Sequence, residues 1–186
     1  MLSFPCDLLW VRAGGRAQFP YGAGQGPVAL SRRRPGERGG PEVVRAAGNA
    51  TLVGHSDLPA IADRYPGEGP LGGILTALHH TSSDWNLIVA CDMPEISAAF
   101  LAELVAHALR SPADVLLPVD FDGRPQPLCA VYHRHALAVL ERHFASGVRK
   151  ITAALTGLVV ERLAVAELSL FQNVNTPEDW AAYVAE

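Results

Sequence analysis

The chain has 186 residues, which is enough for one domain with a sizeable hydrophobic core, and we expect a single domain over 1–186. Its formal net charge of −4 argues against a general nucleic-acid binder, and no apolar run approaches the ~20 residues that span a bilayer. The three cysteines are odd in number and widely spaced, which favours reduced thiols in a cytoplasmic protein over a disulfide framework or a zinc site.

The first forty residues have the least regular pattern in the chain. A strand is predicted at 4–11 and would end at Ala13-Gly14-Gly15-Arg16. From 18 to 40, Gly, Pro and Arg crowd the sequence without a helical or strand period, which is typical of a loop or linker. We interpret the arginine triplet at 32–34 as a solvated charge run in preference to a phosphate-binding patch.

Regular pattern returns at residue 41, and a glycine-rich turn follows a predicted short strand at 42–49. Four glycines and two prolines fall within the eight positions 66–73. Glycines at the start of a helix let backbone N–H groups approach an anion or a flat ring closely. The turn is therefore a candidate ligand loop, with an ordinary turn as the alternative. The helix that it begins carries the apolar residues Ile74, Leu75 and Leu78.

The stretch 85–94 is the most informative part of the sequence. Its run at 87–91 is continuously apolar, which is typical of a strand buried on both faces in a parallel sheet. The run stops at Asp92, and ligands of open α/β sheets bind beyond the carboxyl ends of the strands. Asp92 is thus the candidate catalytic residue. The alternative is that it only caps the helix predicted from about Ser97.

The second half alternates helices with strands. A helix is predicted from about Ser97 to Arg110, with one apolar stripe and with His107 facing solvent. The stripe comprises Phe100, Leu101, Leu104, Val105, Ala108 and Leu109. Further elements are a strand at 114–119, a turn at Asp122-Gly123, a strand at 126–132, a helix at 135–144, a helix opening at 148–151 and a strand at 158–163.

Two groups of polar residues in this half invite a ligand-binding interpretation. His133, His135 and His143 lack the i, i+4 spacing and acidic partner of a metal site, so we predict none there. Asn173 and Asn175 precede a helix start at 176–177, where paired amides suit hydrogen bonding to a polar ligand. Turn formation by asparagine explains the same pattern equally well.

Five segments in order resemble the molybdenum cofactor guanylyltransferase family, and the resemblance covers the chain from about Asp63 onward. They are Gly-Pro-Leu-Gly-Gly-Ile (69–74), Ala-Cys-Asp-Met-Pro (90–94), Gln-Pro-Leu-Cys-Ala-Val-Tyr (126–132), Gly-Val-Arg-Lys-Ile (147–151) and Asn-Val-Asn-Thr-Pro-Glu-Asp (173–179). The resemblance implies a three-layer, Rossmann-like, doubly wound and mostly parallel sheet of the nucleotidyltransferase or glycosyltransferase-A type. It also implies transfer of GMP from GTP to the phosphate of molybdopterin with Mg²⁺, releasing pyrophosphate.

The resemblance assigns roles to particular residues. Asp92 would be catalytic and hold Mg²⁺, and the nucleotide would contact Ala13, Gly14, Gly15, Asn49, Asp63, Gly69, Pro70, Leu71, Gly72 and Asp92. Molybdopterin would contact Arg149, Asn173 and Asn175, with Arg149 on its phosphate. The substrates implied are GTP and molybdopterin, with transient contact to molybdopterin-synthesis or molybdoenzyme proteins.

The sequence departs from the family pattern at its N-terminal signature. Family members carry Leu-Ala-Gly-Gly-x-Ser-x-Arg-Met-Gly-x-Asp-Lys, whereas here Ala13-Gly14-Gly15-Arg16 is followed directly by a segment that resembles what comes after that lysine. The only lysine in the chain is Lys150. We hypothesise that residues up to about 40 are read out of frame, which translating the coding DNA in all frames tests. A catalytically impaired relative that binds molybdopterin or a partner, and a relative that transfers CMP, are the alternatives.

Overall fold

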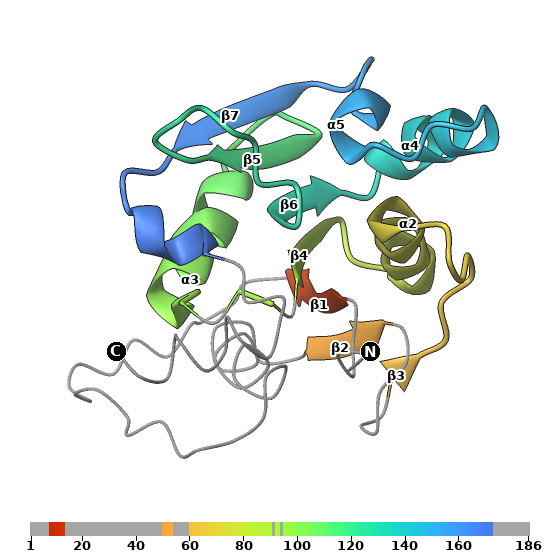
Figure 1. The fold of residues 1–186 in the computed structure, drawn as a ribbon, viewed down its shortest axis with the longest axis horizontal. Coiled ribbons are helices and arrows are strands. Elements are labelled where there is room, and N and C mark those ends of the chain that lie inside the picture. Colours follow the sequence, from red (N-terminus) through yellow and green to blue (C-terminus); the bar gives the residue numbers. More distant parts are fainter. Residues whose placement is uncertain (1–7, 14–49, 54–59, 91, 94, 173–186) are drawn as a thin grey trace.

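The computed structural model describes residues 8–13, 50–53, 60–90, 92–93 and 95–172, shown in colour in Figure 1. Several predictions made from the sequence fall outside these ranges. They concern most of the irregular stretch before residue 41, the strand at 42–49, the helix start at 176–177, and the ligand roles of Gly14, Gly15, Asn49, Asn173 and Asn175.

A seven-stranded sheet organises the described residues, with the strand order β3-β2-β1-β4-β6-β5-β7. The strands are β1 (Leu8–Ala13), β2 (Ala50–Val53), β3 (Ala60–Ile61), β4 (Trp85–Ala90), β5 (Val115–Val119), β6 (Cys129–His133) and β7 (Val160–Ala164). The helices are α2 (Pro70–His80), α3 (Ala98–Ala108), α4 (Ala136–Ala145), α5 (Ile151–Ala154) and the short 3₁₀ turn η1 (Leu168–Phe171).

Five of the seven strands run in one direction, as the pairings between neighbours establish. β2 and β3 pair in parallel, as do β5 and β7, while β1 and β6 are antiparallel to both of their neighbours. The strands β2, β3, β4, β5 and β7 therefore share one orientation, and β1 and β6 are reversed. The predicted mostly parallel, doubly wound α/β fold is confirmed, with these two strands as its exceptions.

Hydrophobic cores lie on both faces of the sheet, and alternate residues of each central strand point to opposite cores. Ile88, Ala130 and Tyr132 pack with α2, α4 and α5 on one face. Leu87, Val89 and Val131 pack with α3 and η1 on the other. This three-layer arrangement is visible in Figure 1, where α2 and α4 lie on one side of the strands and α3 on the other. A strand that buries both faces explains why the sequence there is apolar without alternation.

Helix α3 follows the predicted helix closely and also corrects it. Ser97 is its N-cap, and the Ser97 side chain accepts a hydrogen bond from the Phe100 amide at 3.2 Å. In the predicted stripe, Leu101, Leu104, Val105 and Ala108 are buried and Phe100 is half-buried. Leu109 is 50% exposed because it lies at the C-cap beyond the last turn. The His107 side chain is 36% exposed, and its Nε2 also lies 2.6 Å from Glu161 Oε1 on β7. No helix among the described residues has the length and apolar character needed to cross a bilayer.

Candidate functional site

Two carboxylates lie at the same edge of the sheet, where strands of the common direction end. Asp63 follows the end of β3 by two residues, and Asp92 follows the end of β4 by two residues. Because β3 and β4 run the same way and stand three places apart in the sheet, their ends are separated by about 14 Å. This is the edge at which ligands bind in doubly wound folds, and it defines the candidate active site.

Asp92 has an unsatisfied carboxylate oxygen. Its Oδ1 is buried and has no hydrogen-bonding partner among the described residues. Burial raises the pKa of this carboxyl above its ordinary value, and a hydrogen bond to its own backbone amide partly offsets the rise. A buried acceptor without a donor is costly, so the site suits a group that supplies positive charge. A hard divalent cation such as Mg²⁺, which prefers carboxylate oxygen, fits this atom.

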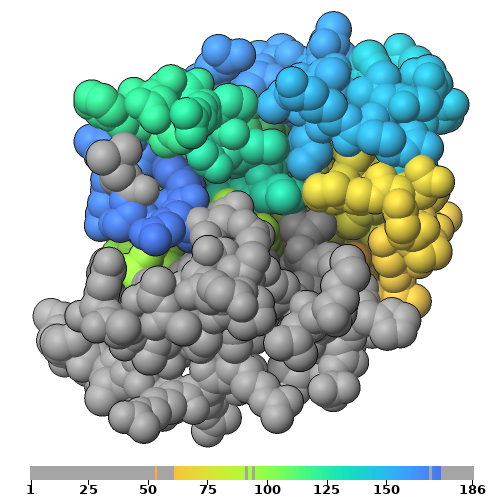
Figure 2. Space-filling model, viewed as in Figure 1, coloured from red at the N-terminus to blue at the C-terminus, as the bar shows by residue number. Residues whose placement is uncertain are grey.

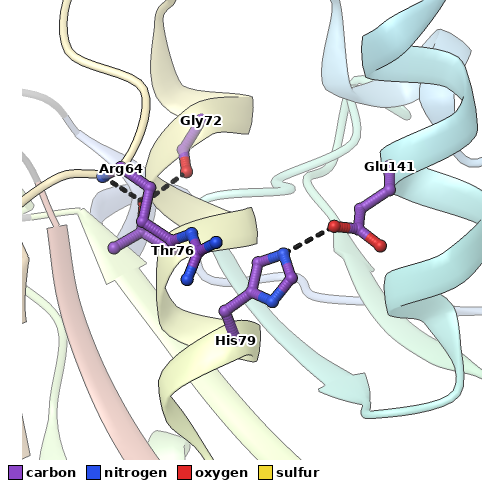
Figure 3. Close-up of polar contacts among 5 residues, drawn as sticks. All are labelled: Arg64, Gly72, Thr76, His79 and Glu141. Atoms are coloured by element: carbon purple, nitrogen blue, oxygen red, sulfur yellow. Dashed lines mark hydrogen bonds and ion pairs between the residues drawn. The ribbon is translucent and has the colours of Figure 1, made fainter.

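Asp63 joins the glycine-rich turn to helix α2. Its Oδ1 accepts hydrogen bonds from the Tyr65 amide at 3.0 Å and from the Thr76 hydroxyl at 2.7 Å. Thr76 is buried on α2, where its Oγ1 also lies 2.9 Å from the Gly72 carbonyl and accepts from the Arg64 amide at 3.0 Å. Figure 3 shows the Arg64 and Gly72 contacts converging on Thr76. One carboxylate oxygen of Asp63 thus fixes the approach to α2.

The glycine-rich turn needs its glycines for two different reasons. Gly67 and Gly69 have φ values of 80° and 82°, a region that side chains with a Cβ disfavour. At Gly72 the reason is lack of space, because a Cβ there would lie 3.0 Å from Tyr65 Cβ and 3.2 Å from the Tyr65 carbonyl oxygen. Pro70 occupies the first turn of α2, where a missing N–H costs nothing. The turn therefore brings backbone close to the start of α2, at the same edge as Asp92.

Arg149 lies against this turn, although 81 positions separate it from Glu68 in the sequence. Its Nε donates to Glu68 Oε2 at 2.6 Å, and its Nη1 donates to the carbonyls of Phe144 at 2.8 Å and Val148 at 3.2 Å. The guanidinium stacks over the Phe144 ring at 4.0 Å, and that ring contacts Tyr65 at a centroid distance of 4.7 Å. Arg149, the glycine-rich turn and Asp63 thus form one continuous cluster.

Helices α2 and α4 support this cluster on one face of the sheet. His79 Nε2 on α2 lies 2.5 Å from Glu141 Oε1 on α4, as Figure 3 shows. In the space-filling view of Figure 2, the yellow surface of α2 meets the light-blue surface of α4 and α5 directly. The turn that carries Glu68 and the segment that carries Arg149 are therefore held together by packing as well as by their ion pair.

Ala13 lies away from the other predicted ligand residues. Because β1 is antiparallel to β4, Leu8 pairs with Ala90 and Ala13 pairs with Trp85. Trp85 begins β4, so Ala13 stands at the edge of the sheet opposite to Asp92, about 17 Å along the strand from the Ala90 end. The structure brings together Asp63, the residues Gly69 to Gly72 and Arg149, and it places Asp92 on their edge; it separates Ala13 from them.

The histidine cluster divides between two different environments. His133 and His135 contact each other with ring centroids 4.2 Å apart, and His133 also contacts Trp85. His143 instead lies on α4 with its Nε2 3.0 Å from the Thr156 carbonyl. Burial, followed by the neighbouring His135, lowers the pKa of His133. Groups of three metal-ligating side chains are absent from the part of the chain that the structure describes.

Two residues of the cluster were missed from the sequence. Thr76 lies in an otherwise apolar stretch of α2, and a single polar residue on a buried helix face is the signal that identifies it. Glu68 lies between two glycines of the turn, and the sequence pattern predicts a turn there without a role for this side chain. Its partnership with Arg149 joins segments far apart in the sequence, so no local pattern reveals it.

The open sheet, its helix layers on both faces and the carboxylate beyond the end of the central strand fit a nucleotidyltransferase fold. The chain belongs to the MobA-like NTP transferase domain family, whose sequence model matches residues 26–159. The match begins within the irregular N-terminal stretch, at residue 26.

Similar proteins support the same family. A molybdenum cofactor guanylyltransferase from Serratia proteamaculans is 31% identical over 182 residues, which cover 91% of this chain and 89% of that protein. A probable molybdenum cofactor guanylyltransferase from Chloroflexus aggregans is 38% identical over 135 residues. The match covers 66% of this chain and 64% of that protein. The crystal structure of molybdopterin-guanine dinucleotide biosynthesis protein A from Archaeoglobus fulgidus has a TM-score of 0.58 and 33% identity, covering 68% of this chain and 66% of that one.

Proposed function

We propose that this chain transfers GMP from GTP to the phosphate of molybdopterin and releases pyrophosphate. The observation that carries the proposal is the buried, unsatisfied Oδ1 of Asp92 at the carboxyl end of the central strand. It stands on the same edge as the glycine-rich turn and Arg149. Relatives that are named molybdenum cofactor guanylyltransferase support the choice of reaction.

The proposed reaction exchanges one phosphoanhydride bond for another. A phosphate oxygen of molybdopterin forms a bond to the α-phosphorus of GTP, and the bond between the α-phosphorus and its bridging oxygen to the β-phosphate breaks. The electron pair of that bond leaves with pyrophosphate. Because both reactants are anionic, the site must place positive charge and N–H donors where negative charge accumulates.

Asp92 would hold Mg²⁺ through its unsatisfied Oδ1, and the ion when bound neutralises charge on the phosphate oxygens of GTP. The residues of the turn would orient the nucleotide. Gly69, Pro70, Leu71 and Gly72 would bring backbone against it, and Asp63 would both hold the turn in place and face the nucleotide with its second carboxylate oxygen.

Arg149 would bind the phosphate of molybdopterin, since a planar guanidinium forms paired hydrogen bonds with phosphate oxygens. Its position beside the glycine-rich turn would bring that phosphate toward the nucleotide. Asn173 and Asn175 are proposed to bind the same substrate through their side-chain amides. The part of the turn that binds GTP and the residue that binds molybdopterin would then be neighbours, as a transfer between the two ligands requires.

A catalytically impaired relative is a second candidate, and one specific observation favours it. Ala13 stands at the opposite edge of the sheet from Asp92 because β1 is antiparallel to β4. In this chain the N-terminal signature also lacks its lysine. Losing preorganised donors at a leaving pyrophosphate typically costs about 10²–10³ in rate for each donor. Such a chain would bind molybdopterin through Arg149 and turn over GTP very slowly.

One assay distinguishes three functions: GMP transfer, CMP transfer, and binding without turnover. The purified protein is incubated with Mg²⁺, molybdopterin and either GTP or CTP, and the dinucleotide product and pyrophosphate are quantified. Product with GTP supports the proposal, and product with CTP alone replaces it with CMP transfer. Tight molybdopterin binding without product from either nucleotide supports the impaired relative. Glu103→Gln, which removes an exposed carboxylate on α3, is the matched charge control for Asp92→Asn in the same assay.

A further inference from the structure

The ion pair between Glu68 and Arg149 occupies the groups of Arg149 that would bind a phosphate. A guanidinium binds phosphate in pairs, through Nε with Nη2 or through Nη1 with Nη2. Here Nε donates to Glu68, and Nη1 donates to the carbonyls of Phe144 and Val148. Among the described residues, Nη2 has no hydrogen-bonding partner. Each of the two paired edges is therefore half occupied, and a phosphate must displace one partner to bind through both nitrogens.

Of these partners, Glu68 is the one that can leave. The Phe144 and Val148 carbonyls belong to the turn that ends α4, where backbone hydrogen bonds such as Gly147 to Phe144 at 3.0 Å hold them. Glu68 is 47% exposed and needs only a side-chain rotation to release the guanidinium. Stacking on the Phe144 ring at 4.0 Å would keep Arg149 in place afterwards. A phosphate that binds through two oxygens also forms a stronger contact than the single carboxylate oxygen it replaces.

We infer that Glu68 competes with the substrate's phosphate for Arg149 and so sets the affinity of the site for that phosphate. This rests on the proposed function, in which Arg149 binds the phosphate of molybdopterin. The carboxylate neutralises Arg149 while the site is empty, and only an anion able to take two guanidinium nitrogens displaces it. An anion that makes a single contact binds the free Nη2 and leaves the ion pair in place. The ion pair thus lowers the affinity for ligands that bind Arg149 through two nitrogens, phosphomonoesters among them.

The test is a fluorescence titration with a pterin phosphomonoester and with the same pterin lacking its phosphate. Glu68→Gln keeps the shape of the side chain and removes its charge, whereas Glu68→Asp keeps the charge. Exposed ion pairs contribute little, so we expect Glu68→Gln to lower the dissociation constant of the phosphorylated pterin about two- to fivefold at low salt. Binding of the unphosphorylated pterin should not change. Glu103→Gln controls for the general loss of a negative charge.

The background variant Arg149→Gln separates a failure of this inference from a failure of the proposed function. In that background Glu68→Gln should give no gain, because the competed group is missing. If Arg149→Gln weakens the phosphorylated pterin but Glu68→Gln leaves its binding unchanged or weakens it, the competition is refuted and the function of Arg149 stands. If Arg149→Gln leaves that binding unchanged, the assignment of Arg149 to the phosphate is refuted, and the inference falls with it.

Discussion

Replacing Asp92 by asparagine should raise the stability of the protein while it removes metal-dependent nucleotide binding. In the folded protein Oδ1 is buried without a partner, and burial penalises the charged carboxylate. Leaving such a group unsatisfied costs roughly 1–3 kcal/mol. Asparagine leaves a polar atom in the same place but carries no charge, so it relieves only part of this cost, and we expect Asp92→Asn to gain about 1 kcal/mol at pH 7. For a chain of this size that corresponds to a rise in Tm of about 2–4 °C.

The gain should depend on pH with a definite sign. The pKa of Asp92 is raised in the folded state, so the protonated carboxyl is favoured there and stability falls as pH rises through that pKa. The advantage of Asp92→Asn is therefore largest at neutral pH. It should shrink as pH falls toward the ordinary aspartate value of 3.8, where the wild-type side chain is also neutral. Thermal unfolding of both proteins without added metal, from pH 7.5 downward, measures this difference.

Magnesium should reverse the order of the two proteins. If Asp92 holds the ion, Mg²⁺ with GTP raises the Tm of the wild type but not of Asp92→Asn, and the variant loses at least tenfold in affinity for GTP, about 1.4 kcal/mol. Calorimetry with and without Mg²⁺ gives both affinities, and Glu103→Gln should behave as the wild type. Equal Mg²⁺-dependent affinity of Asp92→Asn and the wild type would refute the assignment of the metal to Asp92. Equal stability at neutral pH would refute the cost ascribed to burying the charge of Asp92.

Three further substitutions test the structure around the site by thermal or denaturant unfolding. Thr76→Val keeps the shape but removes the hydroxyl that joins Asp63 to α2, so it should cost about 1–3 kcal/mol; no loss would show that this network contributes nothing to stability. Gly72→Ala places a Cβ against the Tyr65 backbone and should cost about 1–3 kcal/mol, unless the turn moves aside. The hydrogen bonds of Ser111 and then His107 lower the pKa of Glu161 below its ordinary value of 4.5. The wild type should therefore be more stable than Glu161→Gln above pH 4.5, and this advantage should be lost as pH falls through the lowered pKa. A difference in stability that does not vary with pH would contradict this.

The elements of the second half were predictable because their signals are local. Continuous apolar residues predicted the doubly buried strand at 87–91, and β4 is observed at Trp85–Ala90. The serine before the apolar stripe predicted the start of α3, where Ser97 is indeed the N-cap. The Asp122-Gly123 signal predicted the turn between β5 and β6, in which Gly123 has a φ of 75°.

The contacts within the candidate site were less predictable because they join residues distant in the sequence. The end of a strand places a carboxylate at the functional edge, and this much follows from pattern alone for Asp92. The sequence pattern does not reveal that Glu68 forms an ion pair with Arg149, or that one carboxylate oxygen of Asp63 accepts a hydrogen bond from Thr76. The same reason explains why the partner of His107 was not predicted, since Glu161 lies on a strand 54 positions later.

The direction of β1 has the largest consequence for function, and no local signal in the sequence encodes it. A strand within a sheet satisfies its hydrogen bonds in either direction, so the composition of 8–13 predicts a strand but not its orientation. The direction nevertheless decides which edge of the sheet receives the residues that follow the strand. With Ala13 beside Trp85, the chain leaves β1 at the edge opposite to Asp92. A strand parallel to β4 would instead deliver the same residues to the edge that carries Asp92, Asp63 and the glycine-rich turn. This orientation of β1 is the observation that favours the proposed impaired binder over the proposed transferase, and the product assay with GTP tests that choice most directly.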